Sequence, residues 1–553
     1  MGLANFLDKA ALGAAQILSG YNRSEFEAAL LQTEIGIVFG SNAISTHEGR
    51  AALDMLIRLL ARLFPSLSLV NQTQDNQFQN ELEALAKSIN PEVNLSTRRS
   101  NIYVMVGEVE LQFNDTPTFF IGASEWIAKF STSKIQTFDN SNNPFGAGAV
   151  ACFAAANVFR LVFKDQLPHG KLDTDFSFSV FDLVKNPGKM VNIGLKNVNI
   201  NQIHLFGAGA IGNGFIWALK NILGLKGQLH ICDDQTIELS NLQRYVLASQ
   251  QDVGHLKVDC SASQLNDSGL EIVKHPFKLQ NLFSQAKNYN IEVAAICVDS
   301  AEDRMALQST LPKKIFNAWT QLESIGISRH SDFLNSACVC CLYLPEEKKQ
   351  SRSEEVASNL GIQAHERIVR DYLASGKTVD QFLLNLVQSS NNLPDQSLAH
   401  LEGLSLDNFY SHVVCGGVLM NLSPDQNIPS KIEVPCAFES ALAGILLASE
   451  VVIDSGNLRS KNITSSSRLN LLRPLSDYLN IQHIKHLSGK CICQDEIFLS
   501  VYFKKWDVSS SLYVNSESGD LSQKGKQRAQ IFSGHNPKRE DVNDSKLSQK
   551  EKN

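Results

Sequence analysis

The sequence predicts an α/β protein with a parallel sheet and more than one domain. The main observation is an apolar run at 203–206, followed by a glycine-rich segment, a helical pattern and a second apolar run at 229–232. This order of strand, turn, helix and strand is the repeating unit of a parallel sheet covered by helices. The length of 553 residues also exceeds what a single hydrophobic core organises. We therefore expect a Rossmann-like sheet and at least one further unit.

The composition is that of an ordinary globular protein, with 43% hydrophobic and 19% charged residues. A net charge of −7 gives no general attraction to nucleic acid or to an anionic membrane. The N-terminus lacks the pattern of a secretory signal, and no apolar run approaches the length of a bilayer span. Eleven scattered cysteines, an odd number, suit a reducing compartment. We expect a soluble cytoplasmic protein without nucleic-acid or membrane partners.

The first unit is expected to span residues 1–195. Residues 48–63 carry leucines at helical spacing, and 67–70 and 102–106 have the pattern of strands. Residues 143–163 begin with a Pro-Phe-Gly turn and continue as an apolar helix rich in small residues. Such a helix is predicted to be buried.

Gly146 and Gly148 in this helix imitate the glycine spacing of the later nucleotide-type segment. Two interpretations follow: the helix is a closely packed core element, or the first unit is a degenerate copy of the second. No clear strand leads into the segment, and no polar motif follows it, which favours the core element.

The second unit, residues 196–506, begins with the glycine motif. Gly207 permits a tight turn, Gly209 lets the backbone approach a phosphate, and Gly212 lets the helix lie close to the sheet. The start of the helix offers free N–H groups to an anion. Asp233 ends the second strand, about where a ribose hydroxyl is bound in such folds. These residues predict a nucleotide site.

The rest of the second unit is expected to contain a strand ending at Asp299, a crossover insertion, and a final group of strand-like and helical segments. Their expected positions are 293–298, 344–430, 431–434 (strand-like), 437–452 (helix) and 498–503 (last strand). Residues 507–553 are rich in Ser, Lys, Gln, Asn and Asp, which predicts a disordered tail.

Five motifs in one order carry a family resemblance. They are GxGxxG at 207–212, Asp233, SNLQR at 240–244, VGHLK at 253–257 and the strand ending in Asp299. This order resembles the ThiF/MoeB/ubiquitin-activating superfamily, which adenylates the C-terminal glycine of ubiquitin-like proteins. The resemblance is close over 198–345 and looser to 506. It implies two Rossmann-like ThiF-type lobes, of which the N-terminal lobe is inactive and the C-terminal lobe active.

The resemblance implies that Asn241, Arg244 and Lys257 contact the phosphates of ATP and that Asp299 is associated with Mg²⁺. The chemistry agrees, because a carboxylate attacks the α-phosphate while pyrophosphate leaves, and positive groups must meet the developing charge. A carboxylate oxygen is also a ligand that Mg²⁺ prefers. Arg244 and Lys257 are therefore the predicted catalytic cations.

Two positions depart from the family's pattern. Gln235 stands where the second aspartate of the family's DxD motif falls, with Asp234 one place earlier, and Tyr245 stands where a glutamine usually follows the arginine. The first change either weakens metal handling or is compensated by Asp234. Neither change removes the cations.

Cys338 and Cys341 lie where MoeB-like enzymes carry half of a four-cysteine zinc site. Cys491 and Cys493 are available for the other half, although they are spaced C-x-C instead of C-x-x-C. Four thiolates would complete a tetrahedral structural Zn²⁺ site. The alternative is that each cysteine is a buried thiol. Cys340 is left over in either case.

An activating enzyme that forms a thioester also needs a nucleophilic cysteine. Cys415 is favoured because two glycines follow it and His412 precedes it closely. Cys436, at the start of a small-residue helix, is the alternative, since a helix N-terminus lowers a thiol pKa. It also remains open that neither is catalytic. The other thiols are expected in the core, at Cys152, Cys232, Cys260 and Cys297.

The two-unit layout resembles the activating enzymes of bacterial operons for ubiquitin-like conjugation, which are associated with antiphage defence. This implies ATP, Mg²⁺ and structural Zn²⁺ as cofactors, and a ubiquitin-like protein and a conjugating enzyme as partners of a monomer or homodimer. No ubiquitin-conjugating domain is apparent in the chain. The alternatives are a sulfur-carrier adenylyltransferase of the MoeB or ThiF kind and a non-catalytic scaffold. A nicotinamide-dependent oxidoreductase is disfavoured, because it has no use for the three phosphate-binding side chains.

Overall fold

The computed structural model describes residues 2–508 apart from short internal segments. The residues left out within that range are 75, 96–98, 112, 114, 189–192, 279–280, 282–289, 323, 345–350, 392, 395, 416–432, 461–462 and 478. The predicted tail from residue 509 onward therefore lies outside the described residues.

The first lobe contains an eight-stranded sheet in the order β3-β2-β1-β4-β5-β6-β7-β8. Its strands are β1 (Glu34–Phe39), β2 (Ser66–Asn71), β3 (Asn94–Leu95), β4 (Ile102–Val106), β5 (Thr118–Ser124), β6 (Ile127–Ser131), β7 (Phe176–Ser179) and β8 (Val184–Lys185). Its helices are α1 (Leu7–Ile17), α2 (Arg23–Gln32), α3 (Ser41–Ser45), α4 (His47–Leu60), α5 (Gln77–Ile89) and α6 (Phe145–Val162). The predicted helix and strands of this half are confirmed.

The second lobe contains a sheet in the order β11-β10-β9-β12-β13-β14-β15-β16. Its strands are β9 (Asn199–Phe206), β10 (Lys226–Cys232), β11 (Leu270–His275), β12 (Val293–Ile296), β13 (Lys314–Gln321), β14 (Ser324–His330), β15 (Ser466–Leu469) and β16 (Asn480–Ile481). Its helical elements include α7 (Ala210–Lys220), the 3-10 helix η1 (Leu239–Gln243), α8 (Lys257–Ser263), α10 (Ala301–Ser309), α11 (Val339–Tyr343), α17 (Ala437–Ser455) and α18 (Glu496–Trp506).

The two sheets repeat one topology. In each sheet the first five strands in spatial order are parallel, and the last three pair antiparallel. A repeated order with the same switch from parallel to antiparallel pairing indicates internal duplication. The two-lobed α/β fold is confirmed, and the structure supports the interpretation of the first unit as a degenerate copy.

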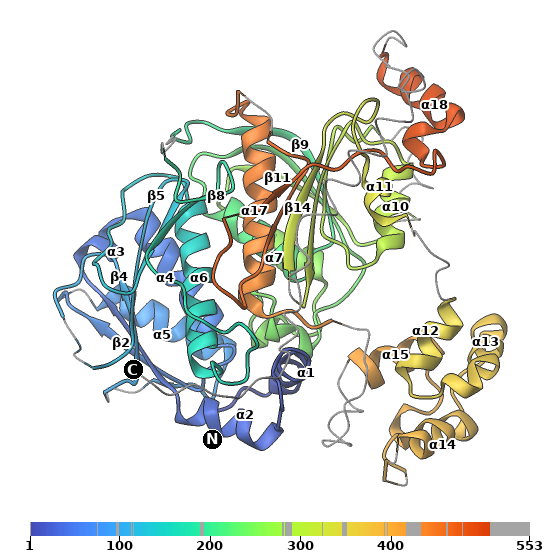
Figure 1. The fold of residues 1–553 in the computed structure, drawn as a ribbon, viewed down its shortest axis with the longest axis horizontal. Helices are drawn as coiled ribbons and strands as arrows, with labels where there is room; N and C mark the ends of the chain where they lie inside the picture. Colours follow the sequence, from blue (N-terminus) through green and yellow to red (C-terminus); the bar gives the residue numbers. More distant parts are fainter. Residues whose placement is uncertain are drawn as a thin grey trace, which may run out of the picture.

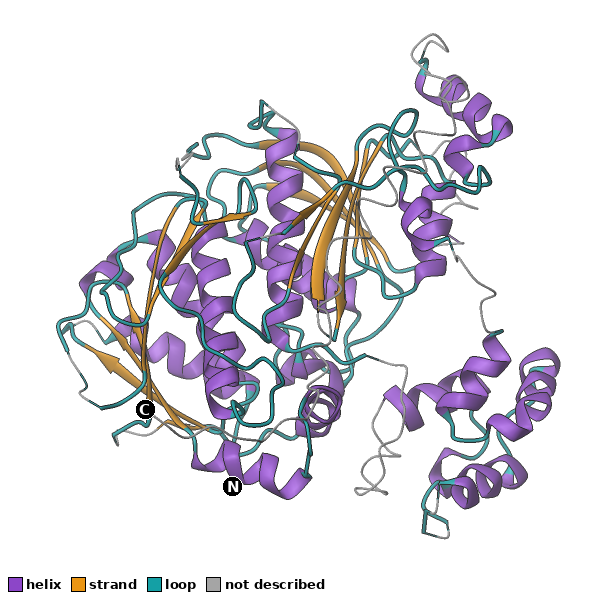
Figure 2. Ribbon diagram, in the orientation of Figure 1, coloured by secondary structure: helices purple, strands orange, loops and turns teal. Residues whose placement is uncertain are grey.

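Helices from both lobes fill the space between the sheets (Figures 1 and 2). Helix α6 packs on β5 and β6, α17 packs on β13 and β14, and the two helices contact each other. A Cβ atom on Gly148 of α6 would lie 2.5 Å from the Trp217 ring of α7. The lobes therefore approach each other where only glycine fits.

The place of α6 corrects one sequence-based interpretation. Helix α6 lies between β6 and β7 in the chain, as α17 lies between β14 and β15, so its counterpart is α17 and not the helix of the glycine motif. Gly146 and Gly148 serve close packing. Helix α6 is long and apolar enough to cross a membrane by composition alone, contrary to expectation, but 89% of it is buried inside the protein. Its composition is accounted for by the core.

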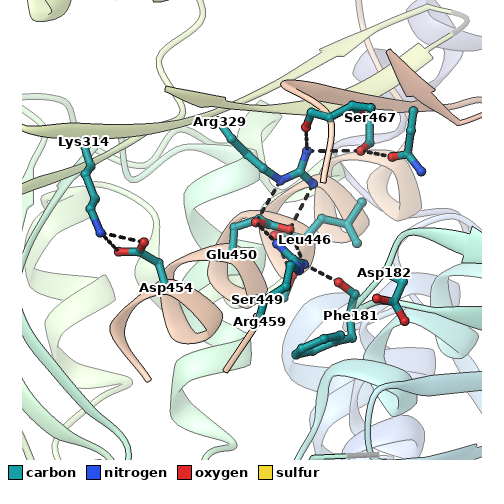
Figure 3. A network of polar contacts seen from close by, with 12 residues as sticks. Phe181, Asp182, Lys314, Arg329, Leu446, Ser449, Glu450, Asp454, Arg459 and Ser467 are labelled. Atoms are coloured by element: carbon teal, nitrogen blue, oxygen red, sulfur yellow. Dashed lines mark hydrogen bonds and ion pairs between the residues drawn. The ribbon is translucent and has the colours of Figure 1, made fainter. Parts of the chain in front are cut away.

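A buried ion network also fixes the second lobe against the first (Figure 3). Glu450 of α17 accepts hydrogen bonds from Arg329 of β14 at 3.0 Å and from Arg459 at 2.9 Å. Burial acts to raise the pKa of Glu450, but the two guanidinium groups lower it overall. Arg459 also donates to the carbonyl oxygen of Phe181 in the first lobe. The carboxylate thus orients an arginine that joins the lobes.

The C-terminal segments differ from the prediction. Residues 498–503 were expected to form a strand, but they belong to helix α18, which Asp495 caps by accepting from the N–H groups of Ile497 and Phe498. Burial of Leu499 and Tyr502, three residues apart, follows the helical period. Of the strand-like segment 431–434, residues 431–432 lie outside the described part, and 433–434 form no strand.

The insertion is helical, as predicted. It contains α12 (Arg352–Asn359), α13 (Glu366–Ser375), α14 (Gln381–Ser390) and α15 (Leu406–Tyr410). These helices share an apolar core of their own, with buried residues from Val356 to Val413. Figure 1 shows them beside the two lobes.

Candidate nucleotide and metal sites

The glycine loop joins β9 to α7, and each glycine has a distinct role. Gly207 has φ +96°, and a Cβ there would lie 2.9 Å from the carbonyl oxygen of Cys297. A Cβ on Gly212 would lie 2.4 Å from the carbonyl oxygen of Gly207, so this glycine lets the helix close onto the loop itself. At Gly209 a Cβ would meet only Tyr245, at 3.4 Å. The loop backbone is therefore open to a ligand at Gly209.

Asn213 on α7 holds this loop, a role that the sequence analysis missed. Its amide donates to the carbonyl oxygens of Ala208 at 3.1 Å and Gly209 at 2.9 Å, and its Oδ1 accepts from the N–H of Leu247. The side chain is 5% exposed. The available signal was one amide in an otherwise apolar helical pattern. No side chain among the described residues caps the N-terminus of α7, which leaves its N–H groups for an anion.

Asp233 ends β10 beside the loop, as predicted. Its Oδ2 accepts from the N–H of Ala208 at 2.8 Å, and its Oδ1 accepts from the N–H of Gln235 at 3.0 Å. Each carboxylate oxygen has two lone pairs, so the fixed carboxylate can still accept from a ribose hydroxyl.

Lys257, the first residue of α8, is 5% exposed. Its Nζ donates to Oε1 of Gln235 at 2.5 Å and lies 5.3 Å from the centre of the Tyr245 ring. Burial acts to lower the pKa of this ammonium, whereas the phenol of Tyr245 and the carboxylates of Asp233 and Asp299 raise it overall. Lys257 therefore remains a cation. The two departures from the family's pattern both contact this lysine.

Asn241 lies on η1, and Arg244 directly follows it. Asn241 Oδ1 accepts from the N–H of Glu238 at 3.0 Å, which completes the capping box of η1. The half-exposed guanidinium of Arg244 makes no hydrogen bond or ion pair within the described part of the chain. Asp299 is exposed just beyond β12. A cation and a carboxylate are thus available at the carboxyl ends of the strands.

The equivalent place in the first lobe is closed. Strand β1 is followed by Gly40 and helix α3, and the amide group of Asn42 on α3 bonds both the N–H and the carbonyl oxygen of Phe138, at 2.9 and 3.0 Å. A Cβ on Gly107, after β4, would lie 2.7 Å from Asn42 Oδ1. Strand β2 is followed by Gln72, at the position where Asp233 follows β10. The first lobe thus lacks an open phosphate loop.

The four predicted zinc ligands, Cys338, Cys341, Cys491 and Cys493, come together. Their sulfur atoms all lie within 4.8 Å of one another, with Sγ–Sγ distances of 3.4 to 3.9 Å across four of the pairs. Tetrahedral zinc with Zn–S bonds of about 2.3 Å needs sulfurs about 3.8 Å apart. The donor set therefore fits Zn²⁺.

Of the four cluster thiols, Cys341 is the one favoured as a thiolate, whereas hydrogen bonds with neighbouring thiols and burial raise the pKa of Cys338, Cys491 and Cys493 overall. The N–H of His486 donates to Cys341 Sγ at 3.3 Å. Hydrogen bonds from the neighbouring thiols, Cys338 first, lower the pKa of Cys341. Cys340 is not one of the four clustered sulfur atoms, and its Sγ lies 3.8 Å from the carbonyl oxygen of Met305. It is left over, as the sequence suggested.

The two candidate nucleophiles, Cys415 and Cys436, differ in what the structure describes of their side chains. Cys415 ends the π-helical turn Ser411–Cys415, and its side chain lies outside the described residues. Cys436 caps α17 and lines an apolar cavity of about 40 Å³ between the lobes. Burial raises the pKa of Cys436 well above that of a free thiol, and Glu439 adds to this. The expected lowering by the helix N-terminus is outweighed.

Among the cysteines expected in the core, Cys152, Cys232 and Cys297 are buried, and burial raises the pKa of each. Cys260 is only partly buried, and its pKa is raised to about 11, mainly by burial. These four thiols are poor nucleophiles at neutral pH.

Two family profiles match the chain. The profile of the ThiF family matches residues 189–362, and that of prokaryotic E2 family C matches residues 38–164. The second match was not expected, since no conjugating domain is apparent in the sequence. Residues 38–164 belong to the first lobe, and their one cysteine, Cys152, is fully buried. This region therefore offers no accessible thiol.

Several known proteins are similar in sequence. The uncharacterized protein y4jF of Sinorhizobium fredii is 39% identical over 512 residues, which are 92% of this chain and 98% of that protein. The NEDD8-activating enzyme E1 catalytic subunit of Saccharomyces cerevisiae is 34% identical over 117 residues, 20% of this chain and 38% of that subunit. The corresponding subunit of Drosophila melanogaster is 40% identical over 65 residues, 12% of this chain and 14% of that subunit. The chain thus spans less than two fifths of either NEDD8-activating subunit.

Among solved structures, E. coli MccB in complex with MccA-N7isoASN matches with a TM-score of 0.33 and 13% identity, covering 53% of this chain and 67% of that one. The ThiF match begins just before β9 and contains the glycine loop, Asp233, Lys257 and Asp299. The chain therefore belongs to the ThiF/MoeB/ubiquitin-activating enzyme superfamily, whose members carry out ATP-dependent adenylation.

Proposed function

We propose that this protein activates a ubiquitin-like protein by adenylating its C-terminal carboxylate with ATP. The adenylate is then converted to a thioester on a cysteine of this chain and passed to a conjugating enzyme. The observation that carries the proposal is a buried lysine, Lys257, kept cationic between Asp233 and Asp299 beside a glycine loop open at Gly209. Hydride transfer by a nicotinamide cofactor does not need such a cation, whereas binding of a triphosphate does.

The proposal gives each group a task that its position supports. Asp233 binds the ribose, and the N–H groups of the glycine loop and α7 bind phosphate oxygens. Arg244 and Lys257 meet the negative charge that develops when the carboxylate oxygen bonds to the α-phosphorus and the bond to pyrophosphate breaks. Mg²⁺ held by Asp299 supplies further charge neutralisation when it is bound.

The substrate class rests on the two-lobed design and on the similarity to NEDD8-activating subunits. The match to a prokaryotic E2 family supports a setting in which conjugating proteins act together with this chain. The bacterial operons for ubiquitin-like conjugation, which are linked to antiphage defence, are the proposed context. Cys415 is the proposed nucleophile, because Cys436 is enclosed and has a raised pKa.

ATP–pyrophosphate exchange with the purified chain tests this function. We expect exchange only when a ubiquitin-like protein ending in glycine is present, and a thioester with the enzyme that dithiothreitol cleaves. A small protein of this kind encoded by a neighbouring gene is the substrate to use. Adenylate without thioester would favour a sulfur-carrier adenylyltransferase. ATP binding without exchange would favour a scaffold.

A further inference from the structure

An arginine of the first lobe holds the segment that carries the phosphate-binding residues. Arg62 lies two residues beyond α4 and is 1% exposed. Its Nη1 donates to the carbonyl oxygen of Leu242 at 2.7 Å, and its Nη2 donates to those of Val246 and Ala248 at 2.7 and 2.8 Å. These three carbonyl groups bracket Arg244 and its neighbour in the sequence.

The contact is made by a charged group that forms no salt bridge within the described part of the chain. Burial and the neighbouring Arg58 lower the pKa of Arg62 to about 9, and the carboxylate of Asp252 acts against this lowering. It therefore remains protonated at neutral pH. Hydrogen bonds from a guanidinium are stronger than neutral ones, and a buried guanidinium loses more when its acceptors are removed. The three carbonyl groups are thus held in place by this guanidinium, whose hydrogen bonds within the described part of the chain all go to them.

A second arginine extends the contact to the helix of the glycine motif. Arg58 donates to the carbonyl oxygen of Val246 at 3.1 Å and to Asp54 at 2.8 Å. Asp54 in turn accepts from the indole N–H of Trp217 on α7, at 2.7 Å. Helix α4 and Arg62 just beyond it therefore contact two parts of the proposed nucleotide site. These are the segment 242–248 and helix α7, which follows the glycine loop.

We infer that Arg62 is a positioning residue for ATP: the closed lobe fixes the backbone of 242–248 and thereby aims side chains of the open lobe at the phosphates. Between the three carbonyl groups, Arg244 projects its unpaired guanidinium, and Tyr245 places its hydroxyl group beside Gly209. The first lobe thus contributes to nucleotide binding without touching the nucleotide. This inference rests on the proposed ATP site.

The test compares Arg62→Lys with Arg160→Lys in the full chain. A lysine at 62 keeps the charge but cannot bond three diverging carbonyl groups. Arg160 on α6 is also 1% exposed and lies in the same lobe, but it bonds Asp173 and the carbonyl oxygen of Lys171. It therefore controls for the general cost of losing a buried arginine. Calorimetric titration gives the ATP affinity, hydrogen exchange reports on 242–248, and thermal unfolding gives the stability.

We expect Arg62→Lys to weaken ATP binding about tenfold, the size of effect from one or two lost charge-assisted hydrogen bonds, and to speed exchange within 242–248. The KM for ATP should rise more than kcat falls. Arg160→Lys should lower the unfolding temperature and leave ATP affinity within about twofold. If both variants bind ATP as the wild type does, Arg62 only joins the lobes and the inference is overturned.

A failure of Arg62→Lys to fold leaves a second variant. Arg58→Gln removes the bonds of Arg58 to the carbonyl oxygen of Val246 and to Asp54 and keeps Arg62. ATP binding should therefore weaken by a smaller factor, and unchanged affinity would contradict the inference. A wild-type protein that binds no ATP would refute the proposed function and this inference together. Normal wild-type binding with unaffected variants would refute the inference alone.

Discussion

At the scale of single residues, the two predicted catalytic cations differ in what else they do. Lys257 is buried and bonded to Gln235, so its removal empties a packed site as well as removing a charge. Arg244 is half-exposed and makes no side-chain bond within the described residues. Of the two cations, only Arg244 can therefore be replaced to test catalysis without a change in stability.

Replacement of Arg244 by alanine should abolish adenylation while the fold stays intact. The loss of one charged donor to a developing negative charge costs roughly two to three orders of magnitude in rate. The unfolding temperature should stay within the range of a surface substitution. Pyrophosphate exchange and thermal unfolding are the two measurements. Arg367→Ala, at an exposed arginine of α13, is the control, and exchange that survived in Arg244→Ala would remove this residue from the mechanism.

Glu48 at the start of α4 illustrates a buried carboxyl group outside the site. Burial raises its pKa to about 8, although Ser141 and the N–H of Glu125 bond its Oε1 at 2.8 and 2.5 Å. Its Oε2 has no partner in the described residues. The group is therefore largely protonated at neutral pH in the folded protein and ionised in the unfolded chain.

The wild type should lose stability as the pH becomes alkaline, and Glu48→Gln should remove this loss. The folded protein binds the extra proton, so this contribution is present below the ordinary carboxyl pKa and is lost as the pH rises to about 8. At about 1.4 kcal/mol per pKa unit, the wild type should lose several kcal/mol relative to the variant between pH 5 and 8.5. Urea unfolding at both pH values measures this. A constant difference between the two proteins would mean that Glu48 titrates normally.

At the scale of elements, the sequence predicts most helices and strands, and the failures have physical causes. Segment 498–503 has aromatic and β-branched residues that favour a strand, but burial of every third residue against the cysteine-rich core makes it helix α18. The four cysteines were predictable because metal sites impose ligand type and spacing. Arg62 was not, because a bond to backbone carbonyl groups leaves no trace in the acceptor's sequence.

A bound Zn²⁺ should join α11 to the segment that precedes α18. We expect one bound Zn²⁺ per chain by elemental analysis, and its loss with Cys491→Ser, because a site of three thiolates binds much more weakly. The variant should also unfold at a lower temperature. Cys340→Ser is the matched control, since this neighbouring buried thiol is not one of the four clustered sulfur atoms. Zinc retained in Cys491→Ser and lost in Cys340→Ser would reverse the assignment.

At the scale of the whole molecule, one topology used twice produces one working site. The polar motifs of the second unit predicted the open lobe, whereas the interpretation of the first unit as a degenerate copy was the less favoured alternative. The order of strands across a sheet cannot be read from the sequence. The duplication places α6 against α17 and lets Asp54 of α4 bond Trp217 of α7, so that one lobe can serve as the support of the other. Asn42 closes the first loop, and that lobe's remaining task is structural.

This shared helical layer predicts that the two lobes unfold together. Because α6 packs against α17 and approaches Trp217 of α7 at Gly148, neither sheet keeps its apolar cover when the other lobe opens. Gly148 is a point of close approach between the lobes, where an added Cβ would meet Trp217 at 2.5 Å and Ile445 at 2.9 Å. Gly148→Ala should therefore cost about 1–3 kcal/mol by overpacking and weaken ATP binding through a shift of α7.

Calorimetry and ATP titration of Gly148→Ala test this coupling. Gly188→Ala is the control, since nothing lies within 4 Å of a Cβ added there. We expect a single transition for wild type and control. In Gly148→Ala we expect a transition that is lowered or divided in two, together with weaker ATP binding. A lowered transition with unchanged ATP affinity would show that the lobes share stability but not function, and would leave Arg62 as the sole route by which the first lobe acts on the site.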